Sequence, residues 1–141
     1  MDQETRSAIM DRVDQEAYGR KLCLRLTELS DGYAMVEMVP GKEHANMFGM
    51  VHGGAIISLM DEAFQASCNS HGRVAVALNM NVAFHRPPKM GRKLKAESVE
   101  VHCSQKTASY EIKVWDEKGA LIASCQALAY RKREVLPFLD R

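Results

Sequence analysis

The sequence predicts an α+β fold in which an antiparallel sheet wraps around one long, buried helix. Residues 55–70 are apolar around nearly the whole helical circumference, which indicates a helix covered on most sides. A hairpin precedes this helix, and four segments with strand alternation follow it. The length of 141 residues suits one domain. We therefore expect a single domain over residues 1–141, with an N-terminal helix in 1–20 and a peripheral tail at 131–141.

The N-terminal part is predicted to form a surface helix and then the hairpin. Residues 3–18 are polar apart from a thin apolar stripe at helical spacing. Residues 22–29 alternate between leucines and polar side chains, which is typical of a strand. The turn Ser30-Asp31-Gly32 leads into a second strand, 33–39, which ends before Pro40-Gly41.

The first strand after the long helix is expected at residues 74–84. Its even positions are bulky and its odd positions are small, so one face should pack on the core and the other against a close neighbour. Because side chains alternate along a strand, Ala77 and Asn79 are expected on the same face. Arg86-Pro87-Pro88 ends the strand.

Three more strands complete the predicted sheet. In residues 94–103 the apolar positions change parity near Glu97-Ser98, which indicates a β-bulge there. The alternating run 110–114 and the stretch 120–130 flank a turn at 116–119. The last stretch is small and apolar on both faces, as in a central or interface strand.

Composition excludes several classes of protein. The 19 Lys and Arg residues against 18 Asp and Glu leave a net charge of +1, which lacks the positive excess of a general nucleic-acid-binding protein. No apolar run is long enough to span a membrane. The first 20 residues carry eight charged side chains instead of the apolar core of a secretory signal. We expect a cytoplasmic protein that binds neither nucleic acid nor membrane.

Cysteine and histidine spacing predicts neither disulfides nor a metal site. Cys23, Cys68, Cys103 and Cys125 lie far apart, which favours reduced, buried thiols. The five histidines never stand four residues apart with a carboxylate between them, as a zinc hydrolase helix requires. The chain also lacks a phosphate loop, a dinucleotide fingerprint and a GxSxG motif. We therefore expect no metal and no cofactor.

The start of the long helix has the strongest chemical features. Gly53 and Gly54 would expose backbone N–H groups at the positive end of the helix dipole, where a ligand carbonyl can approach closely. Asp61 stands inside the apolar helix, and Glu62 is an alternative carboxylate about 100° around it. Asp61 lies seven residues beyond Gly54, or ~10 Å along the axis. One reacting carbonyl would therefore meet the glycines of one protomer and Asp61 of another.

The segment NMFGMVHGGAIISLMDEA resembles the acyl-CoA thioesterases of the hotdog fold, and most closely their PaaI-like (phenylacetic-acid-degradation) branch. The shared pattern is an amide residue, five intervening residues, His-Gly-Gly, six more residues and a carboxylate. In this chain these are Asn46, His52-Gly53-Gly54 and Asp61. LNMNVAFHRPPKMGRKLKAES and WDEKGALIASCQALAY are similar to the family's later strands, so the resemblance covers roughly residues 40–130.

The resemblance implies hydrolysis of acyl-CoA with an aromatic or medium-chain acyl group. It implies that the Gly53 N–H polarises the thioester carbonyl, that Asn46 makes a second contact to the carbonyl or to water, and that His52 buttresses the loop. Asp61 of the partner subunit is implied as the nucleophile or the general base, and the two roles stay open. The family's active site lies at a dimer interface, which implies a homodimer or a tetramer built from dimers.

Further residues are expected near the substrate. Some relatives carry Ser or Thr on the strand after the helix, at the position of Ala77, and Asn79 is the candidate replacement for that hydroxyl. The expected substrate-binding residues are Gly54, Phe48, Met50, Phe64, Ala77 and Asn79. The basic residues expected to meet the phosphates of coenzyme A, which require positive charge, are Arg86, Lys89 and Arg92.

Two alternatives compete with hydrolysis. One is a non-catalytic hotdog module that binds or senses acyl-CoA, and the missing hydroxyl at Ala77 is the feature that keeps it open. The other is a hotdog dehydratase, but the histidine and carboxylate pairing of that class is not seen in this sequence.

Overall fold

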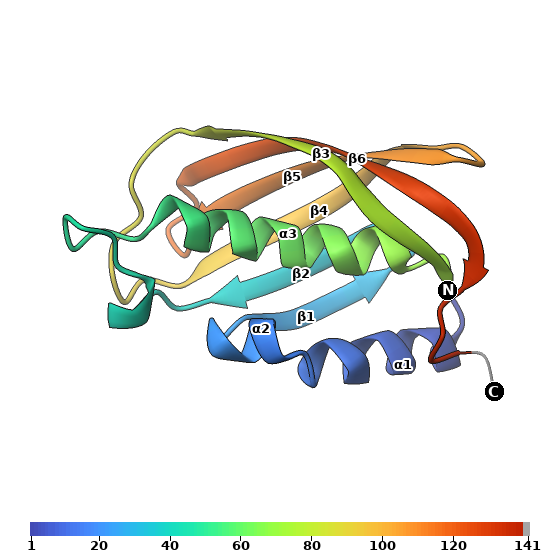
Figure 1. Cartoon of the computed structure of the whole chain (residues 1–141). Helices are drawn as coiled ribbons and strands as arrows, with labels where there is room; N and C mark the ends of the chain where they lie inside the picture. Colours follow the sequence, from blue (N-terminus) through green and yellow to red (C-terminus); the bar gives the residue numbers. More distant parts are fainter. Residues whose placement is uncertain (140–141) are drawn as a thin grey trace.

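A six-stranded antiparallel sheet wraps around helix α3 (Gly53–Asn69) in the computed structural model, which describes residues 1–139 (Figure 1). The strands run in the order β1-β2-β4-β5-β6-β3, so β1 and β3 are the edges of the sheet. The predicted α+β fold with one central helix is confirmed. The strand bounds are β1 (Arg25–Ser30), β2 (Tyr33–Met38), β3 (Arg73–Phe84), β4 (Leu94–Cys103), β5 (Thr107–Asp116) and β6 (Leu121–Val135).

Helix α3 is buried because apolar side chains cover most of its surface. Leu59, Met60 and Ala63 have no exposed surface, and they belong to the same core cluster as Val36 of β2 and Ile112 of β5. This packing fixes the helix against the concave side of the sheet and so fixes the position of its first residue, Gly53. No helix within residues 1–139 is both long and apolar enough to cross a membrane.

The N-terminal segment forms two helices, so the prediction of one helix over 3–18 is wrong. Helix α1 (Gln3–Asp14) begins at the Asp2 carboxylate, which accepts a hydrogen bond from the Thr5 N–H at 2.7 Å. Helix α2 (Ala17–Lys21) starts after Glu16, whose backbone is extended. The break turns the Glu16 side chain toward α3, where it meets Gln65.

Strand β3 carries a β-bulge at Leu78 that the sequence pattern did not predict. Ala77 pairs with Ala129 of β6, and Asn79 pairs with its neighbour Leu128. Directly paired residues point to the same side of a sheet, so Ala77 and Asn79 lie on opposite faces. The expectation that they share one face is wrong, and with it the idea that Asn79 replaces a hydroxyl at Ala77 from that face.

Strand β4 keeps its parity where a bulge was predicted. Ser98 is fully buried and pairs regularly with Ala34 of β2, so the prediction of a bulge near Glu97-Ser98 is wrong. The irregularity lies at Val101, between the pairs that Glu100 and His102 make with β5. Val101 is apolar but 67% exposed, which explains why an apolar pattern alone misplaced the change.

The C-terminal segment is part of the fold, so the prediction of a peripheral tail at 131–141 is wrong. Strand β6 continues to Val135, which pairs with Arg73 at the far end of β3. Leu136 then packs beside Ile9 of α1 in a second small core, and Figure 1 shows this segment returning to α1. The last two residues of the predicted tail, 140–141, lie outside the described residues.

The four cysteines are free thiols, and their burial differs. Cys68 and Cys125 are buried as predicted, Cys103 is half-buried, and Cys23 is exposed. The expectation that all four are buried is therefore wrong for Cys23. This residue adopts a φ of 58° at the turn between α2 and β1, a conformation that exposes its side chain outside the helix and the strand.

Candidate active site

A tight loop at residues 46–50 leads into α3. The Asn46 side-chain oxygen accepts hydrogen bonds from the N–H groups of Phe48 and Met50, at 2.9 and 3.0 Å. Gly49 closes the loop with a φ of +74°, a left-handed conformation that favours glycine. The oxygen of Asn46 is thus used inside the loop, so a contact to a substrate carbonyl can come only from its NH₂ group.

His52 caps the N-terminus of α3. The ring nitrogen Nδ1 of His52 accepts a hydrogen bond from the Gly54 N–H at 2.8 Å. The backbone N–H of His52 donates to the His44 carbonyl. Because Nδ1 accepts, the neutral ring carries its proton on Nε2. The Gly54 N–H is thereby occupied, and the Gly53 N–H has no acceptor among residues 1–139. One free donor therefore stands at the positive end of the helix dipole.

An open pocket of about 320 Å³ borders this donor. Its wall is built from the first turn of α3 and the end of β3: Val51, Gly53, Ile56, Phe84, His85, Arg86, Pro87 and Pro88. A Cβ atom on Gly53 would lie 3.4 and 3.6 Å from atoms of the Phe84 ring, in van der Waals contact, so the glycine keeps a gap of about one methyl group between helix and ring. Apart from Gly53 and Arg86, these lining residues were not predicted to belong to the site, because their contact depends on how β3 ends beside α3.

Asp61 and Glu62 occupy different environments on α3. Asp61 is exposed, while the neighbouring protein removes part of its hydration and raises its pKa, and the charge of Glu16 raises it further. Glu62 is 5% exposed, and its carboxyl oxygen accepts a hydrogen bond from Gln65 at 2.9 Å. Asp61 is therefore the carboxylate that an incoming substrate can reach.

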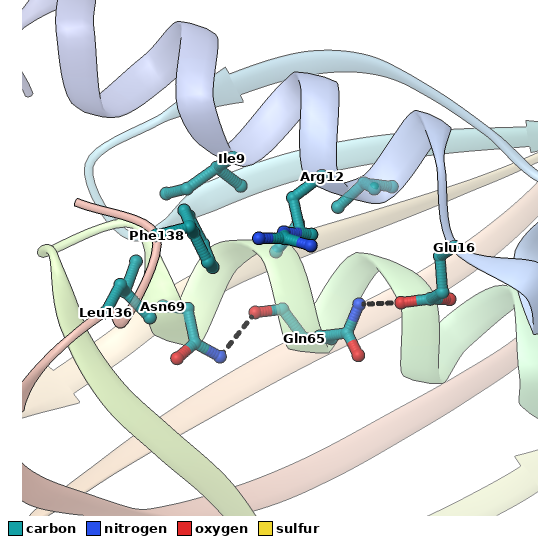
Figure 2. Close-up of a pocket in the computed structure, with 9 residues that line it drawn as sticks. Ile9, Arg12, Glu16, Gln65, Asn69, Leu136 and Phe138 are labelled. Carbon is teal, nitrogen blue, oxygen red and sulfur yellow. Dashed lines mark hydrogen bonds between the residues drawn. The ribbon is translucent and has the colours of Figure 1, made fainter. Parts of the chain in front are cut away.

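Glu16, which is half-buried, lies beside the buried carboxyl of Glu62. The Gln65 side-chain NH₂ donates to Glu16 at 2.7 Å as well as to Glu62, and Figure 2 shows the Glu16 contact at the wall of a pocket between α1, α3 and the C-terminal segment. Burial, and then hydrogen bonding to Glu16 and its charge, raise the pKa of Glu62 to about 8. The protonated form of Glu62 is thus favoured in the folded protein. No local sequence signal links Glu16 to this pair.

The raised pKa of Glu62 predicts a pH-dependent stability. Between the ordinary value of 4.5 and about 8, the folded protein holds a proton on Glu62 that the unfolded chain has released. The free energy of unfolding therefore falls as pH rises through this interval. Thermal unfolding of the wild type and of Glu62→Gln at several pH values measures this contribution, and the variant should show a smaller fall. An identical pH dependence in both proteins would contradict the assignment.

Two of the predicted site residues have other partners. Phe64 is 1% exposed and packs against Tyr110 with ring centroids 5.4 Å apart, so it belongs to the core and does not line the pocket at Gly53. Arg92 forms an ion pair with the buried Asp116 at 3.4 Å. Its guanidinium group, which was expected to bind a phosphate of coenzyme A, therefore already has an acidic partner in the fold.

The remaining predicted residues lie near the surface. Phe48 is 76% exposed and Met50 is 45% exposed on the loop before α3. Arg86 and Lys89 are exposed beyond the end of β3, and Arg86 lines the pocket at Gly53. Within one chain Gly53 and Asp61 stand eight residues apart on α3, about 12 Å along the axis, so one protomer does not place both on one carbonyl.

Comparisons with known proteins identify the family of the chain. Residues 48–123 match the thioesterase superfamily. The chain is 38% identical over 137 residues to a putative esterase of Archaeoglobus fulgidus, which covers 94% of this chain and 89% of the relative. It is 29% identical over 118 residues to the acyl-coenzyme A thioesterase PaaI of Escherichia coli, with 84% of each chain covered.

The structure of E. coli PaaI superposes with a TM-score of 0.89 and 26% identity, covering 94% of this chain and 96% of that one. The predicted resemblance is thereby confirmed for the family and for the hotdog fold, and it supports hydrolase activity. The chain belongs to the thioesterase superfamily, in its PaaI-like hotdog branch.

Proposed function

We propose that the protein hydrolyses acyl-CoA thioesters, with an aromatic or medium-chain acyl group, to the free acid and coenzyme A. The observation that carries this proposal is the unpartnered Gly53 N–H at the start of α3, beside an open pocket. The name of the E. coli relative, an acyl-coenzyme A thioesterase, supports the class of substrate.

The Gly53 N–H is the electrophilic part of the proposed site. A thioester oxygen that accepts this hydrogen bond gains negative charge as the carbonyl carbon becomes tetrahedral, and the donor and the helix dipole stabilise that charge. The His52 cap contributes indirectly, because it holds Gly54 and so fixes the direction of the neighbouring N–H.

Asp61 of the partner subunit supplies the second half of the reaction. As a general base it takes a proton from water, whose oxygen attacks the carbonyl carbon, and the carbon–sulfur bond then breaks. As a nucleophile it attacks the carbon itself, releases the thiolate and forms a mixed anhydride that water hydrolyses. Both routes give the acid and protonated coenzyme A, and both require an ionised Asp61.

The exposed edge of β3 supports the proposed dimer. One side of β3 pairs with β6, and the other side has no strand beside it among residues 1–139. Val76, Leu78 and Phe84 are 42%, 54% and 52% exposed there, and an apolar edge of this kind is usually covered. Pairing of β3 with β3 of a second chain would continue the sheet and bring the two α3 helices together.

The basic residues Arg86 and Lys89 are proposed to meet the phosphates of coenzyme A. Both are exposed just beyond β3, and Arg86 lies at the pocket that Gly53 borders. Guanidinium groups bind phosphate through paired hydrogen bonds, so Arg86 is the stronger candidate.

A thioesterase assay separates hydrolysis from simple binding. The protein is incubated with a panel of acyl-CoA substrates, and a thiol reagent measures the release of coenzyme A. We expect turnover that depends on the acyl group. Saturable binding of acyl-CoA without thiol release would contradict the proposal and favour the non-catalytic module, the reading left open by the alanine at position 77.

Gly53→Ala tests the oxyanion donor. The added methyl group meets only the Phe84 ring, at 3.4 and 3.6 Å, so the fold should be unchanged, but the methyl group narrows the approach to the N–H. We expect kcat to fall at least about tenfold, short of the roughly 10²–10³ seen when such a donor is removed. Steady-state kinetics give kcat, and thermal unfolding confirms the fold. A folded variant with wild-type kcat would rule out this role for Gly53.

A further inference from the structure

Three side chains with metal-binding atoms meet at the end of the molecule opposite Gly53. They are His71 in the connection after α3, and Glu100 and Cys103 near the end of β4. Their nitrogen, oxygen and sulfur ligand atoms all lie within 4.8 Å of one another. Helix α3 has 17 residues, so the cluster is about 25 Å from Gly53 and is separate from the proposed active site.

The bulge at Val101 creates this cluster. In a regular strand Glu100 and Cys103 would point to opposite faces, because side chains alternate. The extra residue places Glu100 opposite Tyr110 and Cys103 opposite Ala108, two residues that are both buried on the side of α3. His71 is separated by about 30 residues from Glu100 and Cys103, so the spacing of these residues in the sequence did not predict a metal site.

The existing contacts already orient the ligand atoms. The His71 Nε2 lies 2.6 Å from the Glu100 Oε2, which also accepts a hydrogen bond from the Tyr110 hydroxyl at 2.9 Å. The other ring nitrogen of His71, Nδ1, is 3.9 Å from the Asp31 carboxylate. The side chains of His71 and Glu100 are 26% and 20% exposed, so an ion can reach them from solvent.

We infer that His71, Glu100 and Cys103 form a binding site for a divalent transition-metal ion, for which Zn²⁺ is the best match. Imidazole, carboxylate and thiolate are the ligands that zinc combines, whereas Ca²⁺ and Mg²⁺ prefer oxygen alone. Metal–ligand bonds of about 2.0–2.3 Å place the ligand atoms of a tetrahedral site roughly 3.5 Å apart. The Cys103 sulfur must therefore close in on the ion, whereas His71 Nε2 and Glu100 Oε2, now 2.6 Å apart, must separate as bonds to the metal replace the hydrogen bond between them. A water molecule would complete the tetrahedron, and the Asp31 carboxylate, 3.9 Å from Nδ1 and paired with the N-terminal ammonium group, would have to move closer to accept a hydrogen bond from His71.

Binding should release a proton from Cys103. Burial and the Glu100 carboxylate raise the pKa of this thiol, while the guanidinium groups of Arg131 and Arg73 oppose that change. The metal binds the thiolate, so the thiol proton leaves as the sulfur–metal bond forms. Zinc affinity is therefore expected to increase with pH.

Metal titration of the full-length protein, freed of metal by a chelator, tests the site. Zn²⁺ is followed by calorimetry, and Co²⁺ is followed by its sulfur-to-metal charge-transfer absorption. We expect one ion per chain, a thiolate band with Co²⁺ and an unfolding temperature that Zn²⁺ raises. The inference fails if Co²⁺ gives no thiolate band with the wild-type protein.

Matched variants locate the ion. Cys103→Ser and His71→Gln should each abolish the Co²⁺ thiolate band or weaken Zn²⁺ binding at least about tenfold, the lower end of the effect of losing a metal-site group. Cys23→Ser and His102→Ala are the controls, because Cys23 is exposed after α2 and His102 is exposed on the other face of β4. The assignment would be overturned if Cys103→Ser bound Zn²⁺ like the wild type, or if only the control variants lost binding. Thermal unfolding without metal shows whether each variant is folded.

Discussion

Replacing Asp61 with Asn is expected to lower kcat by about 10²–10⁴-fold while the fold and acyl-CoA binding remain. The amide is nearly the same size as the carboxylate, but it can neither accept a proton from water nor attack a carbonyl. Because Asp61 is exposed, the substitution breaks no core contact. Single-turnover kinetics give the chemical rate, and calorimetry with a substrate analogue gives the affinity.

Glu62→Gln is the matched control for Asp61→Asn. Burial raises the pKa of Glu62 and so favours its protonated form, which a glutamine resembles. Its effect on kcat should be far smaller. A folded Asp61→Asn variant with near wild-type kcat, or an equal loss in Glu62→Gln, would refute the role of Asp61.

Leu78→Lys is expected to give a monomer that has lost activity by a similar factor, about 10²-fold or more. Leu78 is 54% exposed on the free edge of β3, and a lysine there would place a charge in the proposed apolar contact between the two β3 strands. A monomer would keep the Gly53 N–H but lose the partner's Asp61. Sedimentation measures the oligomeric state and the thiol assay measures the activity.

Val101→Lys is the matched control for Leu78→Lys, because Val101 is 67% exposed on β4, away from the edge of the sheet. It should keep the dimer and the activity. A fully active wild-type monomer would contradict the shared site.

Mixing subunits gives an independent test of the shared site. A heterodimer of Asp61→Asn and Gly53→Ala chains contains one intact pair, with Gly53 from the first chain and Asp61 from the second. Statistical exchange should restore roughly a quarter of the wild-type activity. No gain above the separate variants after exchange would indicate that each chain uses its own Asp61.

The elements of the fold could be predicted because their periodicity is strong, and their irregularities could not. Helix α3 was expected at residues 55–70 and spans Gly53–Asn69, since its apolar pattern records burial directly. The bulge at Leu78 leaves no such record, because bulky apolar residues continue at every second position from Val74 to Phe84 and the strand is an exposed edge. In β4, Val101 is apolar although it is exposed, so the apolar pattern indicated a bulge at the wrong position.

The part of the candidate site that could be predicted consists of residues close together in the sequence. Asn46, His52 and Gly53 lie within one loop and the first turn of a helix, so their spacing encodes their contacts. Contacts across the fold were not predictable in this way. Glu16 meets Gln65 only because the N-terminal helix breaks beside α3, and Arg92 is neutralised by Asp116 from the adjoining strand.

The strand order has a consequence for how the protein is made. β3 (Arg73–Phe84) is joined to the sheet only through β6 (Leu121–Val135), which is synthesised last among the strands. A nascent chain that ends before β6 therefore presents β3 with both edges bare, and it lacks the neighbour that sets its register. In the proposed dimer, β3 would be presented in its final register only after β6 is in place, so assembly is expected to follow synthesis of that strand, and chains truncated before residue 121 are expected to aggregate instead of pairing.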